Sequence, residues 1–283
     1  MEINELKIFL AVARQGSISR AAEDLHYVQS NVTTRIKQLE ERLGTTLFHR
    51  KSKGVCLTGA GEMLLDYAER IIQLTNEAKE ALSEKGFPQG PLAIGTMETT
   101  AAVRLPNLLA EYHRRYPQVD LTLLTAPSAD SIRRLLDFRV EGALVAGDVT
   151  HPALSMEQVF EEELAVVAPL NVDPLLDDIL KILVFRSGCS YRAQLESWLR
   201  HTGRQNYQTV EFGSIEGIIG CVAAGMGISF LPRSVVDRPH YLQTCSLHRL
   251  PDRFSRMITW FVRRRNEKPS KALQAFRELL LSA

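Results

Sequence analysis

The segment ISRAAEDLHYVQSNVTTRIKQL, residues 18–39, indicates how the first part of this chain folds. Apolar residues at helical spacing predict two short helices. Their apolar faces carry Ala21, Ala22 and Leu25 in the first helix and Val32, Ile36 and Leu39 in the second. Residues 26–28 between them leave room only for a turn. Two helices joined by so short a turn are typical of a helix-turn-helix, whose second helix enters the major groove of DNA.

The outward face of the second helix is polar and rich in hydrogen-bonding groups, as contacts to base edges and phosphates require. It carries Gln29, Ser30, Asn31, Thr33, Thr34, Arg35 and Lys37. We expect Gln29, Asn31, Thr33 and Thr34 to read base edges and Arg20, Arg35 and Lys37 to contact phosphates. The alternative is the solvated face of an ordinary helical hairpin.

Residues 46–58 predict a β-hairpin with basic residues near its tip at Gly54. A basic hairpin that follows a helix-turn-helix is a wing, and its side chains can neutralise phosphates or enter a minor groove. Arg50 and Lys53 are the expected wing contacts. The alternative is a solvated charged loop.

The charge distribution supports a DNA-binding end. The net charge of the 283 residues is only +1, but residues 1–60 hold nine Lys and Arg against six acids, which gives +3. Residues 60–84 hold two basic and six acidic residues, which gives −4. This pattern indicates a basic head followed by a solvated acidic connector.

The composition also bounds the location of the protein. No apolar run approaches the ~20 residues that span a bilayer. The start MEINELKIFL lacks the pattern of a secretion signal. Four scattered cysteines without a CxxC pair fit reduced thiols. We therefore expect a cytoplasmic protein with no membrane partner.

A long helix is predicted over residues 58–83, capped by Thr58. Its apolar stripe has 3–4 spacing and suits pairing with a second copy. The stripe comprises Leu64, Leu65, Ala68, Ile71, Ile72, Thr75, Ala78 and Leu82. The alternative is a stripe that packs on the chain's own second domain. Two glycines and two prolines in residues 86–91 predict a hinge after this helix.

Beyond the hinge, strands alternate with helices, which is typical of an α/β domain. Strands are expected at 92–96, 119–125, 142–146, 164–169, 182–185, 209–212, 228–231 and 257–262. Helices are expected at 99–115, 129–138, 192–201, 214–224 and 270–281. The predicted organisation is a head (1–58), a linker helix (59–85), a hinge (86–91) and an effector domain (92–283). Lobe I of that domain takes about 92–162 and 266–283, and lobe II about 163–265.

Small hydroxyl residues mark the ends of several of these strands, where ligands bind in open α/β sheets. The candidate ligand contacts are Thr99, Thr100, Ser128, Ser187, Cys189, Ser190 and Ser214. Hydroxyls at helix N-termini suit a small anion such as a carboxylate, and Thr100 and Ser187 are the strongest candidates. Each hydroxyl could also serve only as a helix cap. Arg186 and Arg192 could add positive charge or face solvent, and Glu98 is expected to point outward.

The sequence gives little support for catalysis, redox chemistry or metal binding. No nucleophile–base–orienter set has catalytic spacing, so we expect no enzyme. Cys189 lies at a helix N-terminus, which lowers a thiol pKa, but Cys221 is the only candidate for a redox partner. His240, Cys245 and His248 match no zinc pattern. No metal and no cofactor are expected.

Residues 1–60 resemble the winged helix-turn-helix of LysR-type transcriptional regulators, on motifs that run into the start of the next helix. These motifs are FLAVARQGSISRAAEDLH, QSNVTTRIKQLEERLGTTLFHR and LTGAGE. Val28 departs from the family pattern where a Ser or Thr usually caps the second helix, which costs about 1 kcal/mol unless Ser30 substitutes as the cap. Asn31 stands where a small apolar residue or proline is common, and it can bond adenine bidentately.

The resemblance implies a winged helix-turn-helix, a dimerising linker helix and a two-lobed effector domain similar to periplasmic binding proteins. It also implies a homodimer or homotetramer on a pseudo-palindromic operator, a small-molecule co-inducer between the lobes, and RNA polymerase as a further partner. The competing hypothesis is a solute-binding protein or α/β enzyme with an accidental N-terminal hairpin.

Overall fold

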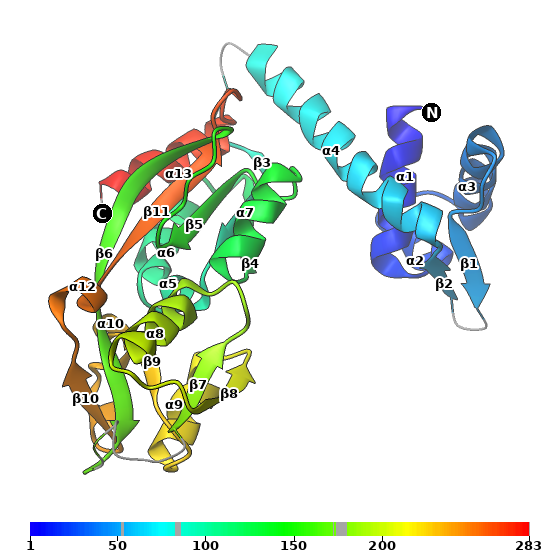
Figure 1. Ribbon diagram of the computed structural model, residues 1–283. Helices are drawn as coiled ribbons and strands as arrows, with labels where there is room; N and C mark the ends of the chain where they lie inside the picture. Colours follow the sequence, from blue (N-terminus) through cyan, green and yellow to red (C-terminus); the bar gives the residue numbers. More distant parts are fainter. Residues whose placement is uncertain (52–53, 83–85, 172, 174–179, 283) are drawn as a thin grey trace. The chain divides into compact units, whose positions relative to one another are not determined.

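A computed structural model describes residues 1–51, 54–82, 86–171, 173 and 180–282. The chain divides into two compact units, the first built on Met1–Lys85 and the second on Gly86–Leu136 and Val140–Ala283. Figure 1 labels the elements of both units. In the described part of the chain, no helix is both long and apolar enough to cross a membrane.

The first unit is a small helical head with a two-stranded hairpin. Its elements are α1 (Ile3–Gln15), α2 (Ile18–Asp24), α3 (Gln29–Leu43), β1 (Phe48–Lys51), β2 (Gly54–Leu57) and α4 (Gly59–Leu82). The predicted apolar faces meet in its core, where Ala21, Val32 and Leu39 are fully buried. Residues 26–28 form the turn between α2 and α3. The predicted winged helix-turn-helix is therefore present.

The helix ends follow the residues that the sequence offers for them. Gly16 and Gly44 end α1 and α3 in the left-handed conformation, which suits glycine. The Ser17 hydroxyl accepts a hydrogen bond from the Arg20 backbone N–H at the start of α2. Thr58 caps α4, since its Oγ1 accepts from the Gly61 N–H at 3.0 Å.

The apolar stripe of α4 does not face outward as a whole. Most of its described members pack into the core of the head against α1 and the hairpin, namely Leu64, Leu65, Ala68, Ile71 and Ile72. Only Ala68 is fully buried there and the other four are half-buried, so the pairing of this stripe with a second copy stays a prediction. The large apolar side chains of α4 that remain exposed are Met63, Tyr67 and Leu74. The side chain of Leu82 lies outside the described part.

A buried carboxylate ties α1 to α3. Glu5 is 1% exposed, and its Oε2 accepts from the Glu2 backbone N–H at 2.9 Å. Its other oxygen accepts from the Arg42 guanidinium near the end of α3. Removing one partner of such a pair leaves a buried charge without compensation, which is strongly destabilising.

The second unit is an α/β domain. Its strands are β3 (Gly90–Thr96), β4 (Val119–Thr125), β5 (Gly142–Ala146), β6 (Leu154–Pro169), β7 (Leu180–Phe185), β8 (Tyr207–Phe212), β9 (Ser229–Pro232), β10 (Cys245–Arg249) and β11 (Arg256–Arg264). Its helices are α5 (Glu98–Val103), α6 (Leu105–Arg115), α7 (Ser128–Leu136), α8 (Ser190–His201), α9 (Ile215–Ala223), α10 (Arg233–Val236), α11 (Pro239–Leu242), α12 (Asp252–Ser255) and α13 (Lys271–Leu281).

The long strand β6 joins two lobes of this domain (Figure 1). Its residues 154–163 pair with β11, which continues through β5 and β3 to β4, and this sheet forms the first lobe. Its residues 164–169 pair with β9 and β10 in the second lobe. The second lobe also holds the parallel pair β7–β8. The two-lobed α/β architecture is thus confirmed.

Several boundaries differ from the expected ones. β6 begins at Leu154, ten residues before the predicted strand, and β11 extends the first lobe's sheet although residues up to 265 were expected in the second lobe. β3 begins at Gly90, inside the expected hinge. The single helix expected at 99–115 is two helices, because Pro106 lies in the first turn of α6 and cannot donate a helical hydrogen bond. The sequence patterns also missed α10, α11, β10 and α12.

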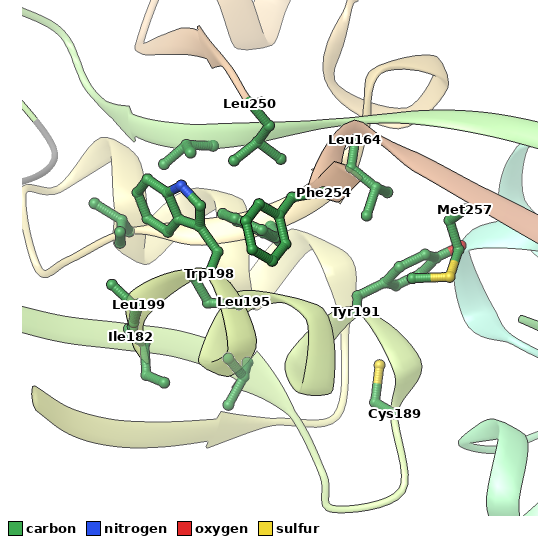
Figure 2. Close-up of a cluster of buried hydrophobic side chains, with 14 of the residues drawn as sticks. Leu164, Ile182, Cys189, Tyr191, Leu195, Trp198, Leu199, Leu250, Phe254 and Met257 are labelled. Carbon is green, nitrogen blue, oxygen red and sulfur yellow. The ribbon is translucent and has the colours of Figure 1, made fainter. Parts of the chain in front are cut away.

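Each lobe has its own core. In the first lobe, α6 and α13 cover the sheet, and the Tyr112 hydroxyl donates to the Ala272 carbonyl at 2.7 Å. In the second lobe, α8 packs its Leu195 and Trp198 against β7 and β9 (Figure 2). Ser270 caps α13 by accepting from the Leu273 N–H at 3.0 Å. Because α13 covers the sheet of the first lobe, the helix lies on this lobe as predicted.

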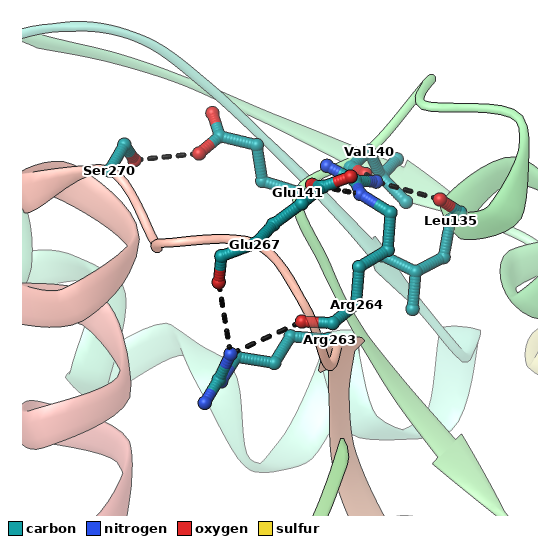
Figure 3. A network of polar contacts seen from close by, with 7 residues as sticks. All are labelled: Leu135, Val140, Glu141, Arg263, Arg264, Glu267 and Ser270. Atoms are coloured by element: carbon teal, nitrogen blue, oxygen red, sulfur yellow. Dashed lines mark hydrogen bonds and ion pairs between the residues drawn. The ribbon is translucent and has the colours of Figure 1, made fainter. Parts of the chain in front are cut away.

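A buried guanidinium holds the turn between α7 and β5 (Figure 3). Arg264 is 8% exposed, and its Nη1 donates to the carbonyls of Leu135 at 2.7 Å and Val140 at 2.8 Å. Its Nε donates to the Glu267 carboxylate. Hydrogen bonds to charged groups contribute more than neutral ones, so this network stabilises the turn between α7 and β5.

Candidate functional site

The outward face of α3 is the candidate nucleic-acid interface. Most of the predicted contacts are exposed, namely Gln29, Ser30, Asn31, Thr34 and Lys37, together with Arg20 at the start of α2. Thr33 and Arg35 are half-buried. The opposite face is packed into the core of the head, since the side chains of Val32, Ile36 and Leu39 are at most 5% exposed. One face of α3 is therefore fixed and the other is available to a groove.

Two of these side chains already have partners within α3. The Thr33 hydroxyl donates to the Gln29 carbonyl at 2.9 Å, which leaves its oxygen as an acceptor for a base donor. Lys37 lies 3.6 Å from the Glu41 carboxylate in an exposed pair. Such surface pairs contribute little, so a phosphate can replace Glu41 at small cost.

The start of α3 lacks a side-chain cap. Val28 occupies the N-cap position, and its side chain accepts no hydrogen bond. Val28 is also 68% exposed, which is unusual for a large apolar side chain. The free N–H groups at this helix end remain available to an anion, and a DNA phosphate is such an anion.

The wing is held against the rest of the head by backbone contacts. β1 and β2 pair antiparallel with Arg50 opposite Val55, and the Val55 N–H donates to the Gly16 carbonyl at 2.9 Å. A Cβ on Gly54 would lie 2.3 Å from that same carbonyl oxygen, so only glycine fits there. Arg50 is exposed on β1, and the other predicted wing contact, Lys53, lies outside the described residues.

Glu40 joins α3 to the wing, a role that the sequence reasoning missed. Its Oε1 accepts from the backbone N–H groups of Leu47 at 2.7 Å and Phe48 at 3.2 Å. A shallow hollow beside it is lined by Thr33, Lys37 and Arg50. The Glu40 side chain therefore connects α3 to the first strand of the wing.

The second candidate site is a cavity of about 190 Å³ between the lobes of the α/β domain. It lies where parallel strands end, after β3 and β4 in the first lobe and after β7 and β8 in the second. Open α/β sheets bind ligands at these carboxyl ends. The lining residues are Met97, Glu98, Thr99, Thr125, Ala126, Pro127, Ser128, Phe185, Arg186, Cys189, Tyr191, Phe212 and Gly213.

Three of the seven predicted ligand residues line this cavity. Thr99 and Ser128 are buried hydroxyls of the first lobe, and Cys189 is a buried thiol of the second. The Ser128 Oγ accepts from the Ala146 N–H at 3.0 Å. The Thr99 hydroxyl donates to the Tyr191 hydroxyl at 3.2 Å, which links the two lobes.

The other four residues lie elsewhere. Thr100 is 4% exposed and does not line the cavity, because the first turn of α5 directs Thr99 there instead. Ser187 is exposed on the loop after β7. Ser190 donates to the Ala146 carbonyl, and Ser214 caps α9 by accepting from the Gly217 N–H at 3.2 Å. Ser214 therefore serves as a helix cap, and the two strongest candidates, Thr100 and Ser187, do not line the cavity.

Glu98 lines the cavity, so the expectation that it points outward is wrong. Its Oε1 accepts from the Ile215 backbone N–H at 3.0 Å, at the first residue of α9 in the other lobe. A helix N-terminus attracts negative charge, which explains the inward direction. Burial raises the pKa of Glu98, the Ile215 hydrogen bond opposes that shift, and the nearby Glu216 charge adds to it.

The Cys189 thiol is not activated. Burial raises its pKa, and this effect exceeds the opposing contributions of the Arg192 and Tyr191 N–H groups and of the Arg192 charge. The sequence expectation of a lowered pKa is therefore wrong, because the helix N-terminus acts here on a desolvated thiol. Cys221 belongs to a different apolar cluster from Cys189.

The two arginines near the cavity differ in their partners. Arg192 contacts Glu196 at 2.8 Å and Glu211 at 2.5 Å, and it does not line the cavity. Arg186 lines the cavity and is exposed. Among the described residues, no three His, Cys, Asp or Glu side chains are grouped to hold a metal ion.

Sequence reasoning also missed the apolar walls of the cavity. Phe185 and Phe212 were expected at the ends of strands and Met97 and Tyr191 in the loops after strands, but none of them was expected as an apolar wall of the cavity. Met97, Phe185 and Phe212 share a signal of position, since each lies at or directly after the carboxyl end of a strand, whereas Tyr191 lies in the first turn of α8.

Comparison with known families accounts for both units. Residues 3–62 match the family model described as "Bacterial regulatory helix-turn-helix protein, lysR family". Residues 85–283 match the model described as "LysR substrate binding domain".

Similar proteins match over nearly the full chain. The HTH-type transcriptional regulator GltR of Bacillus subtilis (strain 168) is 45% identical over 281 residues, 98% of this chain and 95% of that protein. The HTH-type transcriptional regulator SoxR of Arthrobacter sp. (strain TE1826) is 41% identical over 100% of this chain and 98% of its own length.

Solved structures share the fold. A full-length OxyR variant from Pseudomonas aeruginosa matches with a TM-score of 0.73 at 23% identity, over 99% of this chain and 94% of that one. Full-length CbnR, solved in complex with its target DNA, matches with a TM-score of 0.70 at 23% identity, over 99% of each chain.

Proposed function

The chain belongs to the LysR family of DNA-binding transcriptional regulators. We propose that each of its two units has a separate role in regulation. The relatives are named transcriptional regulators, so the protein is a regulator and not an enzyme. We assign operator reading to α3 and the wing, and ligand sensing to the cavity between the lobes. A cytoplasmic location follows from the DNA partner.

In the head, α3 supplies the base contacts and its flanks supply the phosphate contacts. Gln29, Asn31 and Thr34 are exposed hydrogen-bonding side chains of α3, whereas Val32, Ile36 and Leu39 of the same helix are buried. Asn is suited to adenine and Gln can pair in the same way. The basic side chains Arg20, Arg35, Lys37 and Arg50 surround this face and suit phosphates.

In the α/β domain, a small molecule binds in the cavity and changes the relation between the lobes. The observation that carries this proposal is the composition of the cavity wall, to which both lobes contribute. A ligand that contacts both lobes binds one lobe arrangement better than others and shifts the population toward it. Linkage then couples ligand affinity to operator affinity.

The exposed apolar residues of α4 support a homodimer or homotetramer. Met63, Tyr67 and Leu74 recur at the spacing of one helix face and are 48–67% exposed. A second copy of α4 would bury them. Tyr67→Glu should then shift the protein toward a monomer in light scattering, whereas Asp66→Asn should not.

A gel-shift and a ligand-binding experiment test the two assignments separately. Operator affinity, measured on a duplex selected from a random pool, should fall by roughly three orders of magnitude or more between about 50 and 200 mM salt. Ala126→Phe fills the cavity from its wall and should abolish every ligand-induced thermal shift without weakening DNA binding in the absence of ligand. Ligand binding that survives this substitution would place the site elsewhere.

A further inference from the structure

The cavity between the lobes carries one fixed negative and one fixed positive charge. Among the described residues that line it, Glu98 is the only carboxylate and Arg186 the only guanidinium. The remaining lining is apolar or hydroxyl-bearing. We therefore expect a ligand that fills the cavity to carry a positive group for Glu98 and a negative group for Arg186.

Glu98 occupies the place where an anionic ligand would otherwise bind. Its Oε1 accepts a hydrogen bond from the Ile215 backbone N–H of α9 at 3.0 Å. A ligand carboxylate at the same helix end would meet the Glu98 charge at short range, which is unfavourable in a partly buried site. Burial also raises the pKa of Glu98, so its charge is incompletely compensated and gains from a nearby cation. The second carboxylate oxygen is available to an ammonium group.

Arg186 is the complementary group on the second lobe. It makes no ion pair with any described residue, whereas Arg192 is held by two carboxylates. An arginine fork suits a carboxylate, which it can bind through two parallel hydrogen bonds. The negative end of a ligand therefore belongs at Arg186.

We propose that this cavity binds a small α-amino acid, with its ammonium group at Glu98 and its carboxylate at Arg186. The apolar wall formed by Met97, Phe185 and Phe212 receives the side chain of that amino acid. The volume of about 190 Å³ is below the roughly 300–1,000 Å³ of sites for drug-sized ligands, which suits a molecule this small. The inference rests on the proposed function and specifies its ligand class.

A matched set of compounds tests the charge requirement on the full-length protein. The set pairs L-leucine, L-methionine and L-phenylalanine with the carboxylic acid and the amine that each gives when one charged group is removed. Binding is measured by calorimetry and by thermal shift at neutral pH. We expect at least one amino acid to bind and its two single-charge analogues to bind at least tenfold more weakly, as for loss of one charged hydrogen bond.

Two substitutions assign each charge to a residue. Glu98→Gln keeps a carbonyl oxygen for the Ile215 N–H and removes only the charge, so it should weaken the amino acid at least tenfold and leave the deaminated acid unchanged or tighter. Arg186→Gln should weaken both. The controls are Glu278→Gln in α13 and Arg200→Gln in α8, which are exposed and do not line the cavity; they should change neither affinity.

The outcomes separate the inference from the proposed function. If a deaminated acid binds the unaltered protein as tightly as its amino acid, or if Glu98→Gln leaves amino acid affinity unchanged, the inference is wrong and the cavity remains a ligand site. If no amino acid in the set binds, the inference is also overturned. The proposed function itself fails only if ligands found in a wider screen still bind the Ala126→Phe variant.

Discussion

Glu40→Ala should loosen the wing from α3, the helix that we propose reads the operator. The substitution removes the acceptor of the Leu47 N–H at 2.7 Å and of the Phe48 N–H at 3.2 Å. Hydrogen bonds to a charged group contribute about 1.5–3 kcal/mol each, and the longer bond contributes less. Leu47 is 1% exposed, so water does not easily replace the lost acceptor. We expect a loss of about 2–4 kcal/mol in the stability of the head.

Two matched variants isolate this effect. Glu40→Gln retains a carbonyl acceptor and should lose about 1 kcal/mol or less. Glu41→Ala removes the neighbouring carboxylate, which is exposed and pairs only with Lys37 at the surface, and should cost no more than about 0.5 kcal/mol. All three changes lie in α3, so differences in helix propensity between the two alanine variants are small.

The assay must report on the head alone. Both tryptophans, Trp198 and Trp260, lie in the second unit, so the tryptophan fluorescence transition should be the same in all variants. Hydrogen exchange of the Leu47 and Phe48 amides reads the head directly. In Glu40→Ala these amides should exchange roughly 30-fold faster or more, at about 1.4 kcal/mol per tenfold.

DNA binding gives the functional consequence. If Arg50 contacts phosphate from a wing that Glu40 positions, Glu40→Ala should weaken operator binding and reduce its salt dependence, while Glu41→Ala should not. Equal exchange rates in Glu40→Ala and Glu41→Ala would refute the argument that this carboxylate holds the wing. Unchanged DNA affinity with faster exchange would remove only the wing contact.

Three further predictions concern other sites. Asn31→Ala should lower affinity for the selected operator by about 1–3 kcal/mol with little effect on binding to random duplex, whereas Lys37→Ala should weaken binding to the two duplexes equally. If Asn31→Ala weakened binding to operator and random duplex equally, Asn31 would not be a base-reading residue. At about pH 8, iodoacetamide should label Cys56 before Cys189, whose thiol is buried and has a raised pKa, and peptide mass spectrometry showing equal rates would contradict this. Arg264→Met should lower the stability of the second unit by about 2–4 kcal/mol in fluorescence-monitored unfolding, and an unchanged midpoint would show that its buried hydrogen bonds contribute little.

Elements with strong local signals could be predicted from the sequence. The boundaries of β4 match because its apolar and threonine residues are bracketed by Pro117 and Pro127, which cannot donate to a sheet. β5 matches because five small or aliphatic residues lie fully buried before Gly147. The α3 face followed from three apolar residues at helical spacing. In each case the local pattern and the tertiary environment agree.

The first half of β6 could not be predicted, for a physical reason. Residues 154–163 contain four glutamates, a composition that is unfavourable for a buried strand. Each carboxylate has an arginine partner that is distant in sequence: Glu157 with Arg277, Glu161 with Arg256, Glu162 with Arg104 and Glu163 with Arg233. The same limit applies to Glu98, whose direction depends on a helix N-terminus 117 residues away.

Some contacts between the two lobes lie near the strand that joins them, and others lie at the cavity. Their position determines which of them change when a ligand binds. Glu162 is 5% exposed on β6, the strand that joins the lobes, and it holds Arg104 at 2.7 Å and Ser234 at 2.8 Å. A rotation of one lobe on the other moves residues near the joining strand least, so this contact can persist in both arrangements. The Glu98–Ile215 hydrogen bond lies at the cavity instead, where the same rotation has its larger effect. A ligand group that draws Glu98 away from Ile215 would therefore change the lobe relation while Glu162 preserves the connection.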